Sequence, residues 1–262
     1  MTRSHDGKLA RAIRQRLPSA ALFASVLVIW ELAVRILKVP NYLLPAPSVV
    51  FARIVTDWAS LSQNVWVTLE AAIAGFVIGT VIAVLAAFSF LYSKTVEQAV
   101  FPWAVVIKTI PIIAIAPLLT IWLGFGMAPK IAVAAIGCVF PTLVNMNRGL
   151  AAVDQRVIDY LRVLRASPRQ LLAHARIYNA LPYLFSAMKI TVGMAMVGAI
   201  VAEFTGANFG IGTIIVNAGY RQDATLLFSA IFLSSVATLV LYYVVLAIEK
   251  VALFWPGASV DH

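Results

Sequence analysis

Charged side chains are scarce in this sequence: Asp, Glu, Lys and Arg make up 12% of its 262 residues, whereas apolar residues make up 62%. A soluble domain averages about 25% charged residues, because its surface has to stay hydrated. Charge is absent altogether from residues 71–93 and 177–188. These gaps exclude one large soluble domain and indicate a protein that crosses a membrane several times.

Residues that carry chemistry are also few. The single cysteine, Cys138, cannot form an internal disulfide, and the three histidines offer no pair that is spaced as metal ligands. The sequence has no HExxH motif, no paired intramembrane aspartates and no phosphate loop of the form GxxxxGKS/T. We therefore expect no catalytic residues, no metal and no cofactor in this chain.

The sequence is basic, with 20 Lys and Arg against 11 Asp and Glu and a formal net charge of +9. In a soluble protein such an excess would suggest nucleic acid as a partner. Here the cations lie beside apolar runs, so membrane lipid is the expected neighbour and nucleic acid is not.

Six apolar runs are long enough to cross a bilayer as helices, since about 20 residues span a hydrocarbon core of roughly 30 Å. They cover residues 18–37, 65–92, 97–123, 130–146, 181–203 and 224–248. Membrane β-barrels need short alternating segments instead. We predict an all-α polytopic membrane protein with a basic tail (1–17), a first transmembrane helix and external segment (18–64), a transmembrane domain (65–250) and a second tail (251–262).

The positions of lysine and arginine predict the orientation, because cytoplasmic loops carry more of them than external loops. With the N-terminus inside, thirteen fall in the cytoplasm, and the five that fall outside are Arg35, Lys38, Arg53, Lys130 and Arg221. Both termini are therefore expected in the cytoplasm. The basic start resembles a signal peptide, but no small-residue cleavage site follows it, which indicates an uncleaved anchor.

Two segments outside the spans have a predicted structure of their own. Ser48 is expected to cap a surface helix after an extended stretch that contains Pro45 and Pro47. Residues 207–220 contain several glycines, which disfavour an uninterrupted helix. We expect them to form a re-entrant or broken element.

A polar segment interrupts the apolar sequence between residues 148 and 176, where six arginines and two aspartates gather. Asp154 is a favourable N-cap for a helix over residues 155–166. Ser167 followed by Pro168 repeats the start signal for a second helix. The segment is therefore expected to form a short helical hairpin.

The predicted hairpin separates charged from apolar side chains. Asp159 and Arg162 are spaced as an i,i+3 ion pair on its exposed side. Apolar residues crowd one side and arginines remain available to a partner: the apolar set is Tyr160, Leu161, Val163 and Leu164, and the basic set is Arg162, Arg165 and Arg169. The pattern alone favours equally a docking surface and a solvated loop that only enforces orientation.

Four stretches of the sequence carry a family resemblance: YLLPAPSVV at 42–50, PIIAIAPLLTIWLGFGMAPK at 111–130, FPTLVNMNRGLAAVD at 140–154 and AEFTGANFGIGTII at 202–215. Together they resemble the permease subunits of bacterial ABC importers, in the binding-protein-dependent group that includes nitrate, taurine, alkanesulfonate and thiamine-pyrimidine-precursor systems. The resemblance covers about residues 42–248 and implies the type I importer permease fold.

This family has a cytoplasmic signature of the form EAA, three residues, Gly, nine residues, Ile, one residue, Leu-Pro. Its acidic position falls on Asp159, its alanines on Tyr160 and Leu161, its glycine on Arg165, and its Ile, Leu and Pro on Ala175, Ile177 and Tyr178. Arg165 replaces a residue that readily adopts positive φ, which puts the usual corner geometry in question, although the Ser-Pro pair offers another route.

The resemblance implies that residues 148–178 couple this chain to an ATPase. The residues it assigns to coupling are Asp159, Tyr160, Leu161, Arg162, Arg165, Ser167, Pro168 and Arg169. Two permease subunits, expected to be identical, would enclose a pathway in the bacterial inner membrane. Two cytoplasmic ATPase subunits would use ATP and Mg, and an external solute-binding protein would deliver the solute.

Such a chain is a transport subunit and not an enzyme: closure of the ATPases would rotate the hairpins and switch the spans between inward-open and outward-open states. A stand-alone secondary transporter or channel is the alternative. That alternative needs no polar hairpin, and no inverted repeat is visible in the sequence.

Lys108 is the candidate residue for solute contact. At 1.5 Å per residue it lies roughly 16 Å along a helix from Glu97, near mid-bilayer. Either it lines the pathway and attracts an anionic or strongly polar solute, with Pro111 and Pro117 freeing backbone groups nearby, or it pairs with a carboxylate or carbonyl of another span. Glu203 is expected at a different depth, as part of an outer gate or as an interfacial carboxylate.

The sequence leaves the solute open. KTIP at 108–111 and APLL at 116–119 resemble the branch that carries pyrimidine-like or riboflavin-like solutes, whereas the overall pattern equally fits sulfonate, taurine or nitrate carriers. In importers of this kind, specificity largely resides in the external binding protein.

Overall fold

A computed structural model describes the backbone of residues 3–254 and the side chains of residue 18 and residues 21–254. The described part is mainly helical and contains no strand, which confirms the all-α prediction. Helices are favoured because a segment inside lipid has to satisfy its backbone N–H and C=O groups internally. Residues 1–2 and 255–262 of the two predicted tails lie outside the described residues, and residues 3–17 belong to the first helix.

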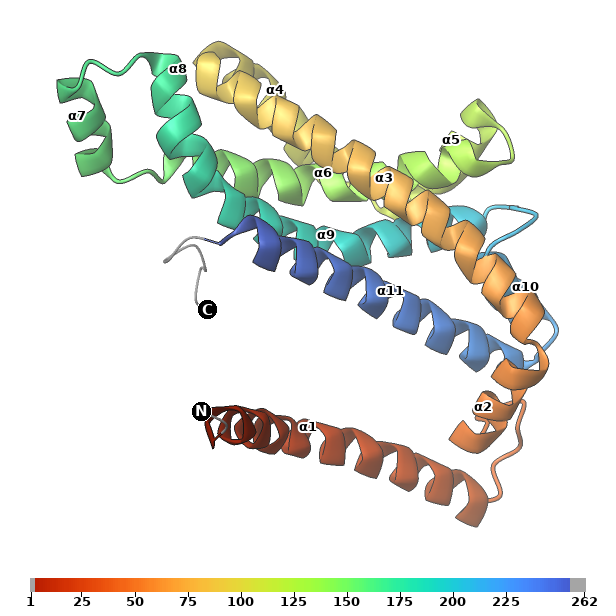
Figure 1. Cartoon of the computed structure of the whole chain (residues 1–262). Coiled ribbons are helices and arrows are strands. Elements are labelled where there is room, and N and C mark those ends of the chain that lie inside the picture. Colours follow the sequence, from red (N-terminus) through yellow and green to blue (C-terminus); the bar gives the residue numbers. More distant parts are fainter. Residues whose placement is uncertain (1–2, 255–262) are drawn as a thin grey trace.

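The helices follow one another along the described chain as Figure 1 shows. Their bounds are α1 Arg3–Ile36, α2 Pro47–Thr56, α3 Trp58–Tyr92, α4 Lys94–Thr109, α5 Ile112–Leu123, α6 Met127–Ala151, α7 Gln155–Val163, α8 Pro168–Leu171, the π-helix η1 Leu172–Arg176, α9 Ile177–Glu203, α10 Ile211–Tyr220 and α11 Ala224–Ala252.

Four helices of the described part are long and apolar enough to cross a membrane: α3, α6, α11 and the run Pro168–Glu203, which joins α8, η1 and α9. The number rises to five if α4 and α5, which meet at 101°, form one bent span. The predicted number of six is not confirmed. The first predicted span, 18–37, is helical as far as Ile36 but lies partly outside the described side chains.

The predicted third span, 97–123, is broken where α4 meets α5. Pro102 lies inside α4 and Pro117 inside α5, and neither ends its helix. The break comes at Pro111, the N-cap of α5, because the residue before a proline is pushed out of the helical region. Ile110 is accordingly extended, with φ −73° and ψ 125°.

Small residues bring α3, α6 and α9 into close contact at the centre of the protein. A Cβ atom added at Gly79 of α3 would lie 2.5 Å from the Ala135 carbonyl oxygen of α6, and one at Gly198 of α9 would lie 2.8 Å from the Ala134 Cα of α6. In lipid, where apolar burial drives helix association little, such close approach provides the van der Waals contacts that hold helices together. Helix α11 packs along α9 outside this layer.

Helix α1 stands apart from the other helices except near its end (Figure 1). There Trp30 contacts Phe228 of α11, with ring centroids 5.8 Å apart. The Glu31 carboxylate accepts hydrogen bonds from the Ser48 hydroxyl (2.7 Å) and the Ser48 N–H (3.0 Å). The prediction that Ser48 caps the surface helix is therefore wrong: α2 begins at Pro47, and Ser48 ties α2 to α1.

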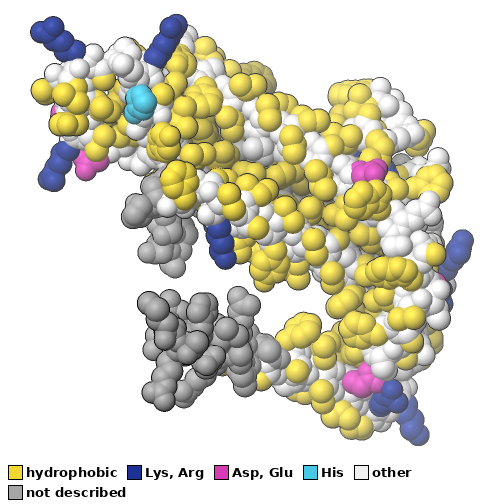
Figure 2. Space-filling model, viewed as in Figure 1, with side chains coloured by type: hydrophobic (Ala, Val, Ile, Leu, Met, Phe, Trp, Pro, Cys, Tyr) yellow, Lys and Arg dark blue, Asp and Glu magenta, His cyan; other side chains and the backbone are white. Residues whose placement is uncertain are grey.

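Charged side chains lie mainly at the two ends of the molecule, and apolar side chains cover most of the surface between them (Figure 2). The hairpin of α7 and α8 lies at one end, which we call the hairpin end. The loop that follows α9 lies at the other, which we call the loop end. A band of apolar surface between polar ends is typical of a protein with several membrane crossings.

Candidate functional site

The predicted hairpin is present, and local hydrogen bonds form it. The Asp154 carboxylate accepts from the Arg156 N–H (2.8 Å) at the start of α7. Ser167 forms a reciprocal capping box with Gln170 at the start of α8. Both predicted caps are confirmed, because each depends only on residues that are close in sequence. The ion pair of Asp159 with Arg162 is also formed, at 3.3 Å.

The chain turns between α7 and α8 at Arg165, whose φ is +55°. The Arg165 N–H bonds to the Arg162 carbonyl and the Ala166 N–H to the Leu161 carbonyl, both at 2.9 Å. These two bonds define a Schellman helix end, in which glycine usually occupies the left-handed position. The corner therefore keeps the left-handed geometry that the replacement of glycine put in question.

Replacing Arg165 by glycine is expected to stabilise the protein. A left-handed residue with a Cβ costs roughly 1–2 kcal/mol, and the extra freedom of glycine in the unfolded chain offsets roughly 0.5–1 kcal/mol of that gain. The midpoint of thermal unfolding in detergent should rise slightly. Arg156→Gly, inside α7, is the control and should lower the midpoint, because glycine in a helix costs about 1 kcal/mol. Equal losses from both variants would contradict the assignment of strain to Arg165.

Apolar side chains of the hairpin face outward. Tyr160, Val163 and Leu164 are 65%, 81% and 60% exposed, and Leu161 is half-buried. The arginines that are predicted to face a partner are exposed as well: Arg162, Arg165 and Arg169. Exposed apolar side chains that lie close together and are bordered by charge are typical of a contact surface for another protein.

The chain that follows the hairpin, in η1 and at the start of α9, is fastened to the adjacent end of α6. The Asn179 amide donates to the Gly149 carbonyl (2.7 Å), and the Arg176 guanidinium donates to the Leu150 carbonyl (3.3 Å). Between α8 and α9 the chain forms the π-helical turn η1, a feature found often at functional sites. A displacement of the hairpin would therefore reach α9 through η1, and α6 through the bonds of Arg176 and Asn179.

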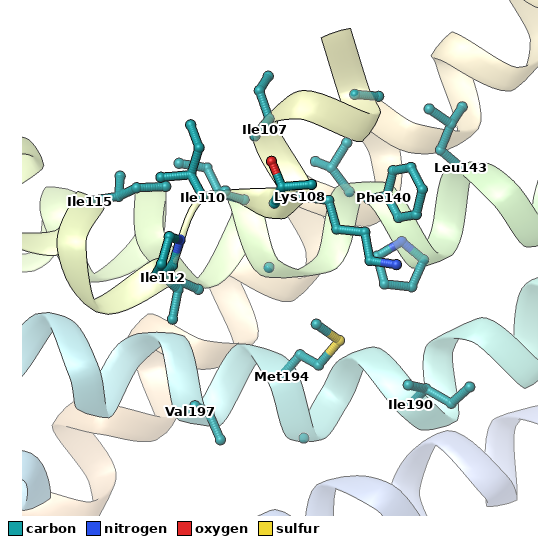
Figure 3. A pocket seen from close by; sticks show the side chains of 18 of the residues that line it. Ile107, Lys108, Ile110, Ile112, Ile115, Phe140, Leu143, Ile190, Met194 and Val197 are labelled. Carbon is teal, nitrogen blue, oxygen red and sulfur yellow. The ribbon is translucent and has the colours of Figure 1, made fainter. Parts of the chain in front are cut away.

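Lys108 lines a cavity of about 910 Å³ beside the break between α4 and α5 (Figure 3). Residues of α3, α6, α9 and α11 complete its wall. The Lys108 ammonium nitrogen lies 4.7 Å from the centroid of the Phe140 ring, which is a cation–π distance. Of the predicted pathway residues, Lys108 and Pro111 line this cavity, whereas Pro117 and Glu203 do not.

Glu203 lies at the loop end of α9 and is buried, with 2% of its surface exposed. It forms an ion pair with Lys130 of α6 (3.1 Å) and accepts hydrogen bonds from the Thr68 hydroxyl of α3 (2.8 Å) and from the Gly212 N–H (2.8 Å). The prediction of an interfacial carboxylate is therefore wrong, because three helices and a loop enclose the group.

Lys130, the partner of Glu203, is buried as well. The orientation argument counts it with the external charges at the start of a span. In the structure it lies in α6 and is 3% exposed, and its ammonium also donates to the Phe209 carbonyl. Lysine near the start of an apolar run carries no local sign of burial. Its partner is 73 residues away in the sequence, so neighbouring residues could not reveal the pair.

The glycine-rich segment forms a loop (204–210) followed by the ten-residue helix α10, so it is broken as predicted. Two N–H groups at this junction donate to α3: Gly210 to the Asn64 side-chain carbonyl (2.7 Å) and Ile211 to the Thr68 hydroxyl (2.9 Å). We refer to the side chains of Asn64, Thr68, Lys130 and Glu203, with the N–H groups of residues 210–212, as the polar cluster.

Residues 75–252, about two thirds of the chain, match the family described as the binding-protein-dependent transport system inner membrane component. The chain belongs to this permease family. The match includes α6, the hairpin, α9 and the glycine-rich loop, and it begins within α3.

Curated relatives of the permease carry consistent descriptions. A probable ABC transporter permease protein of Haemophilus influenzae is 31% identical over 83% of this chain and 89% of the relative. The formylaminopyrimidine transport permease protein ThiX of Halalkalibacterium halodurans is 30% identical over 92% of this chain and 96% of its own length. The riboflavin transport system permease protein RibX of Chloroflexus aurantiacus is 31% identical over 89% and 88%.

Solved structures agree with the permease fold. An inward-facing methionine ABC transporter contains a chain that matches with a TM-score of 0.65 and 21% identity, over 75% of this chain and 97% of that chain. A chain of an amino acid ABC transporter matches with a TM-score of 0.63 and 17% identity, over 76% and 97%. The permease is thus the transmembrane subunit of an ABC importer, a multi-pass membrane protein whose role is transport and not catalysis.

Proposed function

We propose that two copies of this chain enclose the translocation pathway of an importer and that each docks one cytoplasmic ATPase subunit with its hairpin. The ATPases hydrolyse ATP with Mg, and an external binding protein delivers a small solute. The observation that carries this proposal is the exposed apolar surface of the hairpin, at Tyr160, Val163 and Leu164.

The hairpin fits a docking role better than the role of a passive loop. A loop that only enforces orientation needs charge, but it gains nothing from exposed valine, leucine and tyrosine side chains. The corner at Arg165 also keeps a strained backbone conformation, which a solvated loop has no need to preserve. Bonds from Arg176 and Asn179 to the end of α6 connect this surface to the spans that line the cavity.

The apolar surface left open by one chain supports a second copy as partner. Within residues 21–36, where its side chains are described, helix α1 exposes apolar groups, among them Leu22, Ile29 and Ile36, which are 67%, 65% and 74% exposed. Lipid covers part of such a surface, and a second permease covers the part that borders the pathway. An identical partner is the simplest arrangement, because one sequence then supplies both hairpins.

The chain is proposed to lie in the bacterial inner membrane with both termini in the cytoplasm, and its charge distribution supports this orientation. Removing the buried Lys130 from the external group leaves four lysines and arginines outside against thirteen inside. The hairpin supplies several of the thirteen, so the hairpin end faces the cytoplasm and the loop end faces the external binding protein.

The names of the relatives bound the solute class. Formylaminopyrimidine and riboflavin are named for two relatives, and aliphatic sulfonates for a permease protein of Bacillus subtilis that is 26% identical. The solute of this permease is accordingly a small organic molecule of the pyrimidine-like, riboflavin-like or sulfonate-like kind.

Copurification tests the docking proposal. The wild-type chain, extracted from its native membrane in mild detergent, is expected to retain a subunit that carries a GxxxxGKS/T phosphate loop and hydrolyses ATP. Val163→Asp should reduce the retained ATPase at least tenfold, because a charge replaces an apolar side chain that is 81% exposed on the proposed contact surface. The retained ATPase would be quantified by peptide mass spectrometry and by ATP hydrolysis.

Val55→Asp is the matched control, because Val55 on α2 is 75% exposed and lies at the loop end. It should leave the retained ATPase unchanged. If Val163→Asp also has no effect, the hairpin is not the docking surface. Solute uptake by the chain alone in lipid vesicles, without an ATPase, would support the stand-alone carrier instead.

A further inference from the structure

The cavity beside the α4–α5 break carries a single charged side chain on its described wall. Lys108 supplies that charge, and most of the other lining residues are aliphatic or aromatic, including Ile107, Phe140, Ile190 and Met194 (Figure 3). A volume of about 910 Å³ lies within the range of pockets that bind small organic molecules, roughly 300–1,000 Å³. The shape of the site is therefore set by apolar contact, and its polarity is set by one ammonium.

The hydroxyl groups on the wall offer no free hydrogen-bond donor. Each lining hydroxyl donates at 2.7–2.9 Å to a carbonyl three or four residues earlier in its own helix; these hydroxyls belong to Thr109, Ser234, Ser235 and Thr238. A hydroxyl has only one proton to donate. A bound molecule would therefore meet the three N–H groups of Lys108 and the indole N–H of Trp103, and of these two side chains only Lys108 is charged.

The ammonium of Lys108 has no carboxylate partner among the described residues. The acidic residue on its own helix, Glu97, is already bonded to Lys94 (2.7 Å) and to Asn147 (3.0 Å). The contact that Lys108 does make, with the Phe140 ring, leaves its positive charge uncompensated. The first turn of α5, with Ile112 on the cavity wall, adds the positive end of a helix dipole.

We propose that this cavity binds an organic anion with an apolar body, whose sulfonate or carboxylate group meets Lys108 and whose aliphatic or aromatic part lies against Ile190, Met194 and Val197. This inference rests on the proposed function, since it takes the cavity to be part of the solute pathway. Lys108 then determines which solutes are accepted, and the apolar wall admits bodies of different length.

Two other solute classes fit the cavity less well. A small inorganic oxyanion such as nitrate would exchange its hydration shell for one ammonium, one indole N–H and an otherwise apolar wall, which provide fewer donors than water does. An uncharged heterocycle would fill the apolar volume but would leave the charge of Lys108 unpaired. An organic anion satisfies both features of the site at once.

Equilibrium binding of radiolabelled hexanesulfonate tests the proposal. The full-length chain is placed in nanodiscs of phosphatidylcholine, and the wild type is expected to bind the probe saturably. Lys108→Met should weaken binding at least about tenfold, and Lys108→Arg should stay within about threefold of the wild type, because it keeps the charge. Lys94→Met, on the same helix but outside the cavity, should leave binding unchanged.

Competition separates the alternative occupants. Unlabelled hexanoate should displace the probe, whereas nitrate and riboflavin should not. Displacement by nitrate or riboflavin at the same concentration as hexanoate would overturn the proposal, and so would equal binding by the wild type and Lys108→Met. If phosphatidylglycerol in the nanodisc displaces the probe, the cavity is a site for anionic lipid and the solute proposal is wrong.

The binding assay and the copurification assay fail independently. If binding of the probe depends on Lys108 but no ATPase is retained, the proposed cavity site stands and the proposed importer assembly is wrong. If the ATPase is retained but Lys108→Met binds the probe as the wild type does, only the proposal about the cavity is wrong. Unchanged thermal unfolding of Lys108→Met would show that any loss of binding reflects the site and not the fold.

Discussion

Lys130→Met is expected to lower the free energy of unfolding by about 3–5 kcal/mol, because it leaves the carboxylate of Glu203 buried without a counter-ion. The two side chains are 4% and 0% exposed, and their charged atoms lie 3.1 Å apart. The donors that remain for Glu203, the Thr68 hydroxyl and the Gly212 N–H, carry no full charge. The midpoint of thermal unfolding in detergent should fall by roughly 6–20 °C for a protein of this size.

An exposed ion pair in the same chain provides the control. Lys94 and Glu97 lie 2.7 Å apart, but the side chain of Lys94 is 83% exposed. Lys94→Met should cost less than about 1 kcal/mol, because water and salt already screen that pair. If Lys130→Met is no more destabilising than Lys94→Met, the buried pair does not hold the loop end together.

A second substitution separates loss of charge balance from loss of packing. Adding Glu203→Gln to Lys130→Met removes the buried charge, while the amide oxygen still accepts from the Gly212 N–H. The double variant should therefore be more stable than Lys130→Met alone. A double variant that is less stable than the single one would mean that the carboxylate serves its remaining donors and needs no counter-ion.

Hydrogen bonds between neighbours explain why the hairpin could be predicted in detail. Asp154 and Ser167 each bond to an N–H two or three residues ahead, so the sequence window contains both partners. The polar cluster differs, because its members come from α3, α6, α9 and α10. A glutamate after an apolar run and a lysine before one look like ordinary ends of spans until the fold brings them together.

The number of membrane spans could likewise be predicted only in part from local sequence. Apolar runs predicted α3, α6, α9 and α11, because long uncharged segments have few alternatives to a helix in lipid. Whether a proline of this segment interrupts the helix depends on its surroundings. Pro102 and Pro117 lie inside helices, whereas the break between α4 and α5 comes at Pro111. Composition alone could therefore not decide whether residues 97–123 form one span or a bent pair.

Lys108 and Glu203 were both predicted to be pathway residues, but they occupy different surroundings in the structure. Lys108 stood out in the sequence because an ammonium in a span needs water or a partner, and it does line the cavity. Glu203 stood out for the same reason but belongs to the buried polar cluster. Charge in an apolar run thus marks both residues as unusual, and only tertiary contacts separate a wall residue from a structural ion pair.

Gly210→Ala is expected to destabilise the protein by disturbing the backbone of the polar cluster. Gly210 has φ +130° and ψ 157°, a region that is almost restricted to glycine, where a residue with a Cβ costs about 1–3 kcal/mol. The added Cβ would also overlap the Glu203 carboxylate, which cannot retreat without leaving Lys130 or the Gly212 N–H. Overpacking adds about 1–3 kcal/mol, for a total loss of about 2–6 kcal/mol.

Alanine substitutions at two other glycines serve as controls that distinguish backbone strain from steric overlap of the added Cβ. Gly124 also has positive φ, +81°, but a Cβ there would meet nothing within 4 Å, so Gly124→Ala should show the strain alone. Gly193 lies inside α9 with open space around it, and Gly193→Ala should be neutral or stabilising, because alanine favours a helix by about 1 kcal/mol. Thermal unfolding should therefore rank Gly210→Ala lowest. A loss at Gly210 no larger than the loss at Gly124 would mean that the cluster shifts to admit a methyl group, and the loop end would not be rigid.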